Sequence, residues 1–198
     1  ARYAAEGFRE IKVRLGVESP AAEAARLGAI RAAVGDAVHV AVDANGTWTA
    51  EEAVARLALL DGLGLAYVEQ PTAPGDWDAF AAVHARTGLP VMADEGLKTA
   101  EDAAALMRLG PPFLAHLKLP KAGGPRELLA QARALKEAGI GVMVGQMNEG
   151  ALATAAAIHC ALAVRPAHAE LYGAYGLAAD PARGLAYRDG AAWLEGRL

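Results

Sequence analysis

The sequence alternates between short β-rich runs and Ala-rich amphipathic segments of helical period. Between consecutive runs the helical segments are roughly a dozen residues long. This strict alternation predicts parallel strands joined by right-handed helical crossovers, and therefore an α/β fold. The seven predicted strands are residues 10–15, 38–42, 65–69, 90–93, 114–119, 140–144 and 167–171.

Several helix starts carry capping signals. Ser19 followed by Pro20 predicts an N-cap with proline at the first helical position. Thr49 with Glu52, and Thr99 with Asp102, have the spacing of a capping box. These signals support the alternation as a series of strand–helix units.

Two architectures fit such a series, an open doubly wound sheet and a (β/α)₈ barrel. The open sheet normally has a Gly-rich phosphate-binding turn after an early strand. Here the first predicted strand continues as KVRLGVES (residues 12–19), which contains no such turn. We therefore favour a TIM-type barrel, and the residues at the strand ends strengthen that choice.

Almost every predicted strand ends in a charged or polar residue, and these residues recur at steps of 24 to 29 positions. Any one of them alone reads as a solvated loop charge. Seven in register make that reading weak, because in a barrel these positions converge on one mouth, where active sites are built. The residues are Arg14, Asp43, Glu69, Asp94, Lys118, Gln146 and Glu170.

Strand parity indicates where the first of these charges points. Glu10, Lys12 and Arg14 alternate with apolar residues that must pack under helices, so the charged set is expected inside the barrel. The same alternation places Asn45 with Asp43, Tyr67 with Glu69, and His116 with Lys118.

Asp43, Glu69 and Asp94 come from three consecutive predicted strands. Three carboxylates brought together without a cation would repel, and some would be forced to protonate. A hard divalent cation that prefers oxygen ligands resolves this, and Mg²⁺ is the expected ion. A lysine near a metal and another cation can act as a general base, which makes Lys12 and Lys118 candidate catalytic groups.

Composition excludes other classes of protein. The net charge is −4 with no basic stripe, which argues against nucleic-acid binding. No apolar run reaches membrane-spanning length and no signal peptide is evident, so we expect a cytoplasmic protein that does not bind membranes. The single cysteine, Cys160, excludes an internal disulfide and is expected to be buried.

Five stretches of the chain resemble one known family. The pattern is similar to the enolase superfamily, in its mandelate racemase/muconate-lactonizing enzyme branch. The stretches occur in the expected order and cover well over half of the chain from first to last. They are IKVRLG (11–16), VDANGTW (42–48), VEQP (68–71), ADE (93–95) and LKLPKAGG (117–124).

The resemblance implies a modified barrel preceded by a capping domain that closes over the substrate. It implies that Asp43, Glu69 and Asp94 bind Mg²⁺. The shared first step in the family removes the proton α to a carboxylate and gives an enediolate held by the metal. The expected activity is thus that of an isomerase or lyase (a cycloisomerase, dehydratase, or racemase/epimerase) acting on a small carboxylate.

The resemblance also implies roles for other strand-end residues. Lys118 matches the sixth-strand lysine of the muconate-lactonizing subgroup and is the expected acid/base. Lys12 and Arg14 are expected to hold the substrate carboxylate or to tune the charge around it. The seventh-strand histidine of the mandelate racemase subgroup is not evident, and Gln146 stands near its expected place. Independently of the resemblance, we expect Glu170, Gln146 and Asn45 to bind the substrate, with Asn45 also supporting the metal ligands.

The chain departs from the family pattern in two ways. Arg14 stands where the subgroup has a second lysine, and a guanidinium holds its proton too tightly to serve readily as a base. This favours one-base outcomes such as elimination or cycloisomerisation, and leaves a non-catalytic metal-binding relative as the alternative. The capping domain and first strand are also missing, so residues 1–198 are expected to form a single barrel domain containing strands 2–8. We also expect the protein to assemble as a homo-oligomer.

Overall fold

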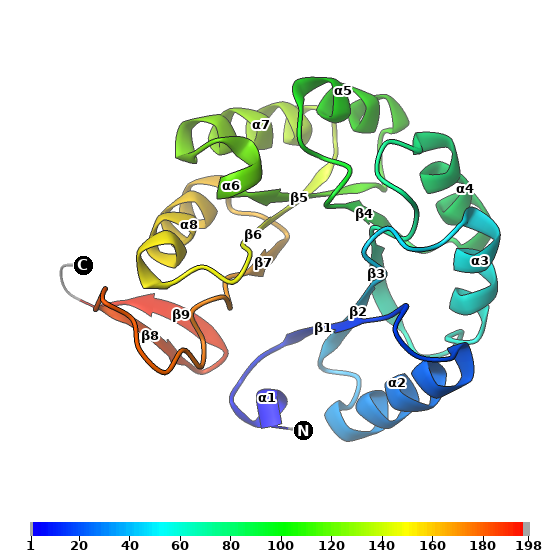
Figure 1. The fold of residues 1–198 in the computed structure, drawn as a ribbon, viewed down its shortest axis with the longest axis horizontal. Helices are drawn as coiled ribbons and strands as arrows, with labels where there is room; N and C mark the ends of the chain where they lie inside the picture. Colours follow the sequence, from blue (N-terminus) through cyan, green and yellow to red (C-terminus); the bar gives the residue numbers. More distant parts are fainter. Residues whose placement is uncertain (1, 196–198) are drawn as a thin grey trace. The chain divides into compact units, whose positions relative to one another are not determined.

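The computed structural model describes residues 2–195, which divide after Gly96 into two compact units. Both units are built from parallel strands alternating with helices, as Figure 1 shows along the chain. The α/β class predicted from the sequence is therefore confirmed. The expectation of one barrel domain over residues 1–198 stays a prediction.

The first unit contains four parallel strands in the order β1-β2-β3-β4. Its register shifts between Val40 and Val42, where β2 pairs with β3. In chain order its elements are α1 (Arg2–Ala5), β1 (Glu10–Arg14), α2 (Pro20–Val34), β2 (His39–Asp43), α3 (Ala50–Ala58), β3 (Leu65–Glu69), α4 (Trp77–Thr87) and β4 (Val91–Ala93).

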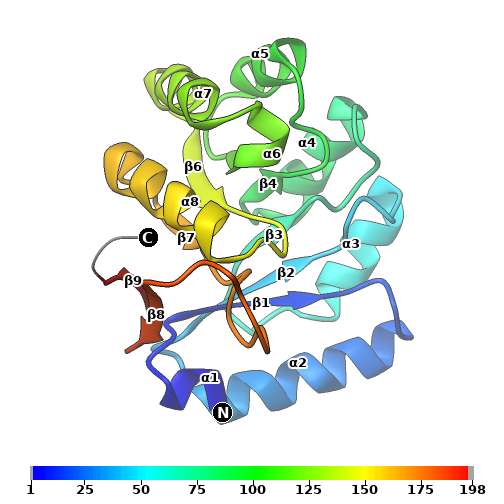
Figure 2. The ribbon, with the colours of Figure 1, turned by 60° about the vertical axis from the view of Figure 1, so that its left-hand side comes forward.

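The second unit contains three parallel strands, β5-β6-β7, followed by a separate antiparallel hairpin. Helices α7 and α8 pack side by side, as seen in Figures 1 and 2. The elements are α5 (Ala100–Leu109), β5 (Leu114–Lys118), α6 (Leu119–Ala122), α7 (Pro125–Glu137), β6 (Gly141–Gly145), α8 (Ala151–Val164), β7 (His168–Glu170), β8 (Leu185–Arg188) and β9 (Ala191–Leu194).

The local signals in the sequence form the expected structures. Ser19 caps α2, and both capping boxes are complete, with Thr49 and Glu52 at α3 and Thr99 and Asp102 at α5. All seven predicted strands are present with ends shifted by no more than one residue. The strands are held by an apolar layer under the helices that includes fully buried Val68, Phe80 and Leu128.

The hairpin β8–β9 is a feature that the sequence reasoning missed. Its two strands are joined by Asp189 and Gly190, both with positive φ (53° and 70°). Asp-Gly is the residue pair preferred in such two-residue turns, so a signal was present. It was overlooked because the hairpin does not belong to the strand–helix repeat.

Two expectations from composition can be compared with the structure. Cys160 is buried, as expected for a small apolar side chain. No helix within residues 2–195 is both long enough and apolar enough to cross a membrane.

Candidate active site

Three acidic side chains stand at successive strand ends of the first unit. Asp43 and Glu69 are the last residues of β2 and β3 and are register partners, and Asp94 directly follows β4. All three are buried, with exposed fractions of 9%, 0% and 4%. Parallel pairing therefore brings the C-terminal ends of β2, β3 and β4 to one edge of the unit, with a carboxylate at each.

Gln70 fixes the backbone that carries Asp94. The Gln70 side-chain oxygen accepts hydrogen bonds from the backbone N–H groups of Asp94 and Gly96, both at 2.9 Å. Its amide nitrogen donates to the Thr72 carbonyl at 3.0 Å. Gln70 belongs to the VEQP stretch of the sequence, but that motif does not show that its side chain holds the backbone of Asp94, because this depends on tertiary contacts.

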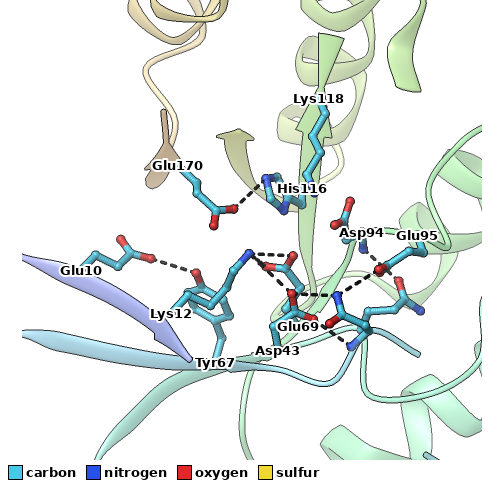
Figure 3. A network of polar contacts seen from close by, with 12 residues as sticks. Glu10, Lys12, Asp43, Tyr67, Glu69, Asp94, Glu95, His116, Lys118 and Glu170 are labelled. Atoms are coloured by element: carbon cyan, nitrogen blue, oxygen red, sulfur yellow. Dashed lines mark hydrogen bonds and ion pairs between the residues drawn. The ribbon is translucent and has the colours of Figure 1, made fainter. Parts of the chain in front are cut away.

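Lys12 of β1 forms a buried ion pair with Glu69 of β3. Its Nζ donates to both Glu69 carboxylate oxygens at 2.9 Å and lies 3.9 Å from Asp43 Oδ2 (Figure 3). The register partner of Lys12 on the intervening strand is Ala41, whose small side chain is fully buried. These contacts place Lys12 and Glu69 on the same face of the sheet.

Glu10 and Tyr67 make a second contact of the same kind, because the Tyr67 hydroxyl donates to Glu10 Oε1 at 2.9 Å. Arg14 ends β1 as predicted, but its side chain is exposed. The three charged residues of β1 therefore lie in different surroundings.

Asn45 ties two carboxylates together. Its backbone N–H and its Nδ2 group donate to the two Asp43 oxygens at 2.9 and 3.1 Å. The same Nδ2 group donates to Glu95 Oε1 at 3.2 Å. Asn45 Oδ1 and Glu95 Oε2 are buried without a hydrogen-bond partner among residues 2–195.

The surroundings of Asp43 disfavour its ionised form. The pKa of Asp43 is raised from 3.8 to about 7, mainly by burial and next by the Glu69 carboxylate. The Lys12 ammonium and the Asn45 backbone N–H lower this pKa, whereas Glu95 raises it. The buried carboxylate oxygens of Asp43, Glu69 and Asp94 are the kind of donor that suits a hard divalent cation such as Mg²⁺.

The second unit carries Lys118, His116 and Glu170. Lys118 ends β5 and is 6% exposed, with its Nζ 3.9 Å from Met147 Sδ. His116, on the same strand face, is fully buried, and its Nε2 lies 3.5 Å from Glu170 Oε2 (Figure 3). Glu170 ends β7, as predicted.

Gly145 of β6 makes the approach of His116 to Glu170 possible. Gly145 is the register partner of both Lys118 and Glu170. A Cβ atom at Gly145 would overlap His116 Nε2. The sequence reasoning placed His116 beside Lys118 but gave it no function, because its contact with Glu170 depends on an intervening residue without a side chain.

Gln146 is buried with its amide orientation fixed by neighbours. Its Nε2 donates to Thr154 Oγ1 at 2.9 Å and to Glu149 Oε2 at 3.3 Å. The Thr154 hydroxyl already donates to the Gly150 carbonyl, so it can only accept from Gln146. The Gln146 Oε1 atom is thus a buried acceptor without a partner among the described residues.

Carboxylates and lysines at the ends of successive parallel strands are typical of (β/α)-barrel enzymes, which build their active sites there. Residues 1–195 match the family model described as enolase C-terminal domain-like. The chain belongs to the enolase superfamily, in its mandelate racemase/muconate-lactonizing enzyme branch. The family and fold class predicted from the sequence are both confirmed.

The chain is similar to curated enzymes with different activities. It is 36% identical over 168 residues to the L-Ala-D/L-Glu epimerase of Bacillus subtilis, covering 82% of this chain and 45% of the relative. It is 32% identical over 157 residues to muconate cycloisomerase 1 of Pseudomonas putida, covering 79% and 42%. The chain therefore spans less than half of these two relatives.

Solved structures show the same similarity. The crystal structure of the dipeptide epimerase from Enterococcus faecalis has a TM-score of 0.90 and 31% sequence identity. The similarity covers 98% of this chain and 57% of that chain. It extends the match from the sequence stretches to the whole described fold.

Proposed function

We propose that this chain is the metal-binding and proton-transferring part of a Mg²⁺-dependent isomerase or lyase that removes the proton α to a carboxylate. The observation that carries the proposal is the cluster of Asp43, Glu69 and Asp94, buried at successive strand ends, with the Asp43 pKa raised to about 7. The proposal is supported by the family to which the chain belongs.

Asp43, Glu69 and Asp94 would hold the ion. When bound, a divalent cation supplies Lewis-acid stabilisation of the negative charge that develops on a carboxylate as its α-proton leaves. Asn45 orients the Asp43 carboxylate through two hydrogen bonds, and Gln70 fixes the backbone N–H of Asp94. These neighbours hold the acids in place before any ion binds, which limits reorganisation on binding.

Lys118 is proposed as the principal acid/base. Lys118 is 6% exposed and is the last residue of β5. It matches the sixth-strand lysine of the family motif. Lys118 would accept the α-proton on its Nζ and could return it to the same face of the α-carbon. Lys12 and Arg14 would bind the substrate carboxylate with their positive charges.

Substrate contacts are proposed for Gln146, Glu170 and Asn45. Gln146 offers a fixed acceptor, Oε1, and Glu170 offers a half-buried carboxylate. Small carboxylates are the substrate class, since the similar proteins are named as dipeptide epimerases and muconate cycloisomerases.

The proposal is tested by α-proton exchange. The full chain with MgCl₂ is incubated in D₂O with a panel of small carboxylic acids that includes dipeptides and muconate, and deuterium incorporation is measured by mass spectrometry. Uptake that requires Mg²⁺ supports the proposal. Binding of Mg²⁺ without exchange of any acid supports the second candidate, a non-catalytic metal-binding relative, which the exposed Arg14 in place of a second lysine favours.

The type of reaction follows from the same experiment. Lys118 serves one face of the α-carbon, and Arg14 is a poor base for the other, so we propose a one-base outcome such as elimination or cycloisomerisation. Each enantiomer of a substrate that is turned over is run separately in D₂O. Equal interconversion, with deuterium in the inverted product, would show two working bases and overturn the one-base assignment.

A further inference from the structure

Lys12 is bonded to the same side chains that are proposed to bind the metal. Both oxygens of Glu69 accept hydrogen bonds from Lys12 Nζ at 2.9 Å, and the Glu69 side chain is fully buried. The same Nζ atom lies 3.9 Å from Asp43 Oδ2. In this arrangement the ammonium acts as a cation bound by two of the three carboxylates.

We propose that Lys12 is the internal counter-cation of the metal-free site: it competes with Mg²⁺ for Glu69, and metal binding releases its ammonium to bind the substrate carboxylate. The inference rests on the proposed metal site and adds an order of events to it. Metal binds first, and the carboxylate-binding group of Lys12 becomes available only afterwards.

Electrostatics supports the competition. A buried carboxylate without a counter-charge is strongly disfavoured, so an ammonium at hydrogen-bonding distance stabilises Glu69 when no metal is present. An ammonium and a divalent cation sharing the same carboxylate oxygens repel each other, and this repulsion is weakly screened in a buried site. Binding of the ion therefore lowers the free energy of the state in which Lys12 has moved away.

The structure also allows the movement. Lysine carries its charge on a flexible four-carbon stem and not on a rigid planar group. Its path from β1 to Glu69 crosses β2 beside Ala41, which contributes only a methyl group. The side chain of Lys12 keeps an exposed fraction of 15%, whereas that of Glu69 has none, so Lys12 is the partner with room to leave.

The test compares the wild type, Lys12→Met, and Lys98→Met as a control. Lys98 is an exposed lysine, so K98M removes the same charge from the chain without removing a buried ion pair. In EDTA, K12M is expected to melt at least about 5 °C below the wild type, because the buried Glu69 carboxylate loses its two hydrogen bonds to the Lys12 ammonium. In calorimetric titrations with MgCl₂, K12M is expected to bind at least about tenfold more tightly than the wild type and K98M.

Each result decides a different point. Equal or weaker Mg²⁺ binding by K12M, with normal binding by the wild type, would overturn the competition while leaving the metal site intact. No Mg²⁺ binding by either protein would overturn the metal site and the inference together. Lys12→Gln, which keeps a neutral donor, replaces K12M if that variant does not fold.

A measurement on the wild type tests the release directly. Reductive methylation with formaldehyde and cyanoborohydride is mapped to individual lysines by peptide mass spectrometry, with and without MgCl₂. Methylation of Lys12 is expected to rise at least about threefold with Mg²⁺, because an ammonium paired with a buried carboxylate reacts slowly. Lys98 should be unchanged, and an unchanged or lower rate at Lys12 would overturn the release.

Discussion

In each unit a basic side chain reaches the glutamate that ends the second strand along the sheet, yet the two contacts differ in their surroundings. In the first unit, Lys12 of β1 reaches over β2 to Glu69 at the end of β3. In the second, His116 of β5 reaches over β6 to Glu170 at the end of β7. In both cases a small residue on the middle strand, Ala41 or Gly145, leaves the space.

The difference lies in what surrounds each pair. Glu69 is fully buried beside Asp43, whose pKa is raised mainly by burial and next by the Glu69 carboxylate. The Glu170 side chain is 35% exposed. Its partner, His116, lies on the same face of β5 as Lys118. The function that we propose places metal binding in the first unit and proton transfer by Lys118 in the second.

The largest effect is expected from Lys118→Ala. Loss of the proposed base should lower the rate of α-proton exchange in D₂O by about 10³-fold, within the range typical of general-base catalysis. The increase in melting temperature produced by MgCl₂ should match that of the wild type, because Lys118 is not among the proposed metal ligands. Full residual exchange would exclude Lys118 as the base, and loss of the Mg²⁺ effect would contradict the separation of metal binding from proton transfer.

Glu69→Gln and Glu170→Gln provide a matched pair on the two units. Glu69→Gln should weaken Mg²⁺ binding by more than about 100-fold in calorimetric titration, because neighbours of ligands alone commonly account for 10- to 100-fold. Glu170→Gln should leave Mg²⁺ affinity within about twofold of the wild type. If the two variants lose affinity equally, the metal site is not confined to the first unit.

The pH dependence of stability follows from Asp43. Its pKa is raised in the folded, metal-free protein, so the protonated carboxyl stabilises the fold below about pH 4, and this stabilisation is lost as the pH rises towards 7. Mg²⁺ binds the ionised form, so the increase in melting temperature with MgCl₂ should be larger at pH 8 than at pH 5.5. Asp43→Asn should remove most of the pH dependence of stability measured without Mg²⁺. An unchanged dependence in that variant would assign it to another titrating group.

A smaller effect is expected from Gly145→Ala, which tests the space above β6. The added Cβ overlaps His116 Nε2, so the free energy of unfolding should fall by about 1–3 kcal/mol in urea denaturation. The control is Gly28→Ala, where a Cβ meets nothing within 4 Å and which should be neutral or stabilising by up to about 1 kcal/mol. His116→Ala in the Gly145→Ala background should restore part of the loss. Without such recovery, His116 is not the residue that the Cβ displaces.

The strand ends were predictable because their polar residues interrupt apolar runs at a regular spacing. Asp43, Glu69, Lys118 and Glu170 each end a strand as predicted, and Asp94 follows one. The residues that share a face within one strand, such as Tyr67 with Glu69, were also predictable, since this depends only on the two-residue alternation of a strand.

Contacts that depend on register across strands were not predictable. The approach of His116 to Glu170 requires a glycine on the strand between them. Gln70 accepts hydrogen bonds from backbone N–H groups 24 and 26 residues further along the chain. The exposed position of Arg14 was missed for a related reason. Alternation gives the face of a side chain but not its exposure, and Arg14 is exposed although Glu69, which also ends a strand, is buried.

The central claim, that Asp43, Glu69 and Asp94 hold one divalent ion, is tested most directly by a crystal structure of the full chain grown with MnCl₂. Anomalous scattering locates Mn²⁺, which takes the same oxygen ligands as Mg²⁺. The account predicts one strong peak at the ends of β2, β3 and β4, with a carboxylate oxygen of each acid at about 2.0–2.4 Å. A peak bound by other side chains, or no peak near these three carboxylates, would contradict it.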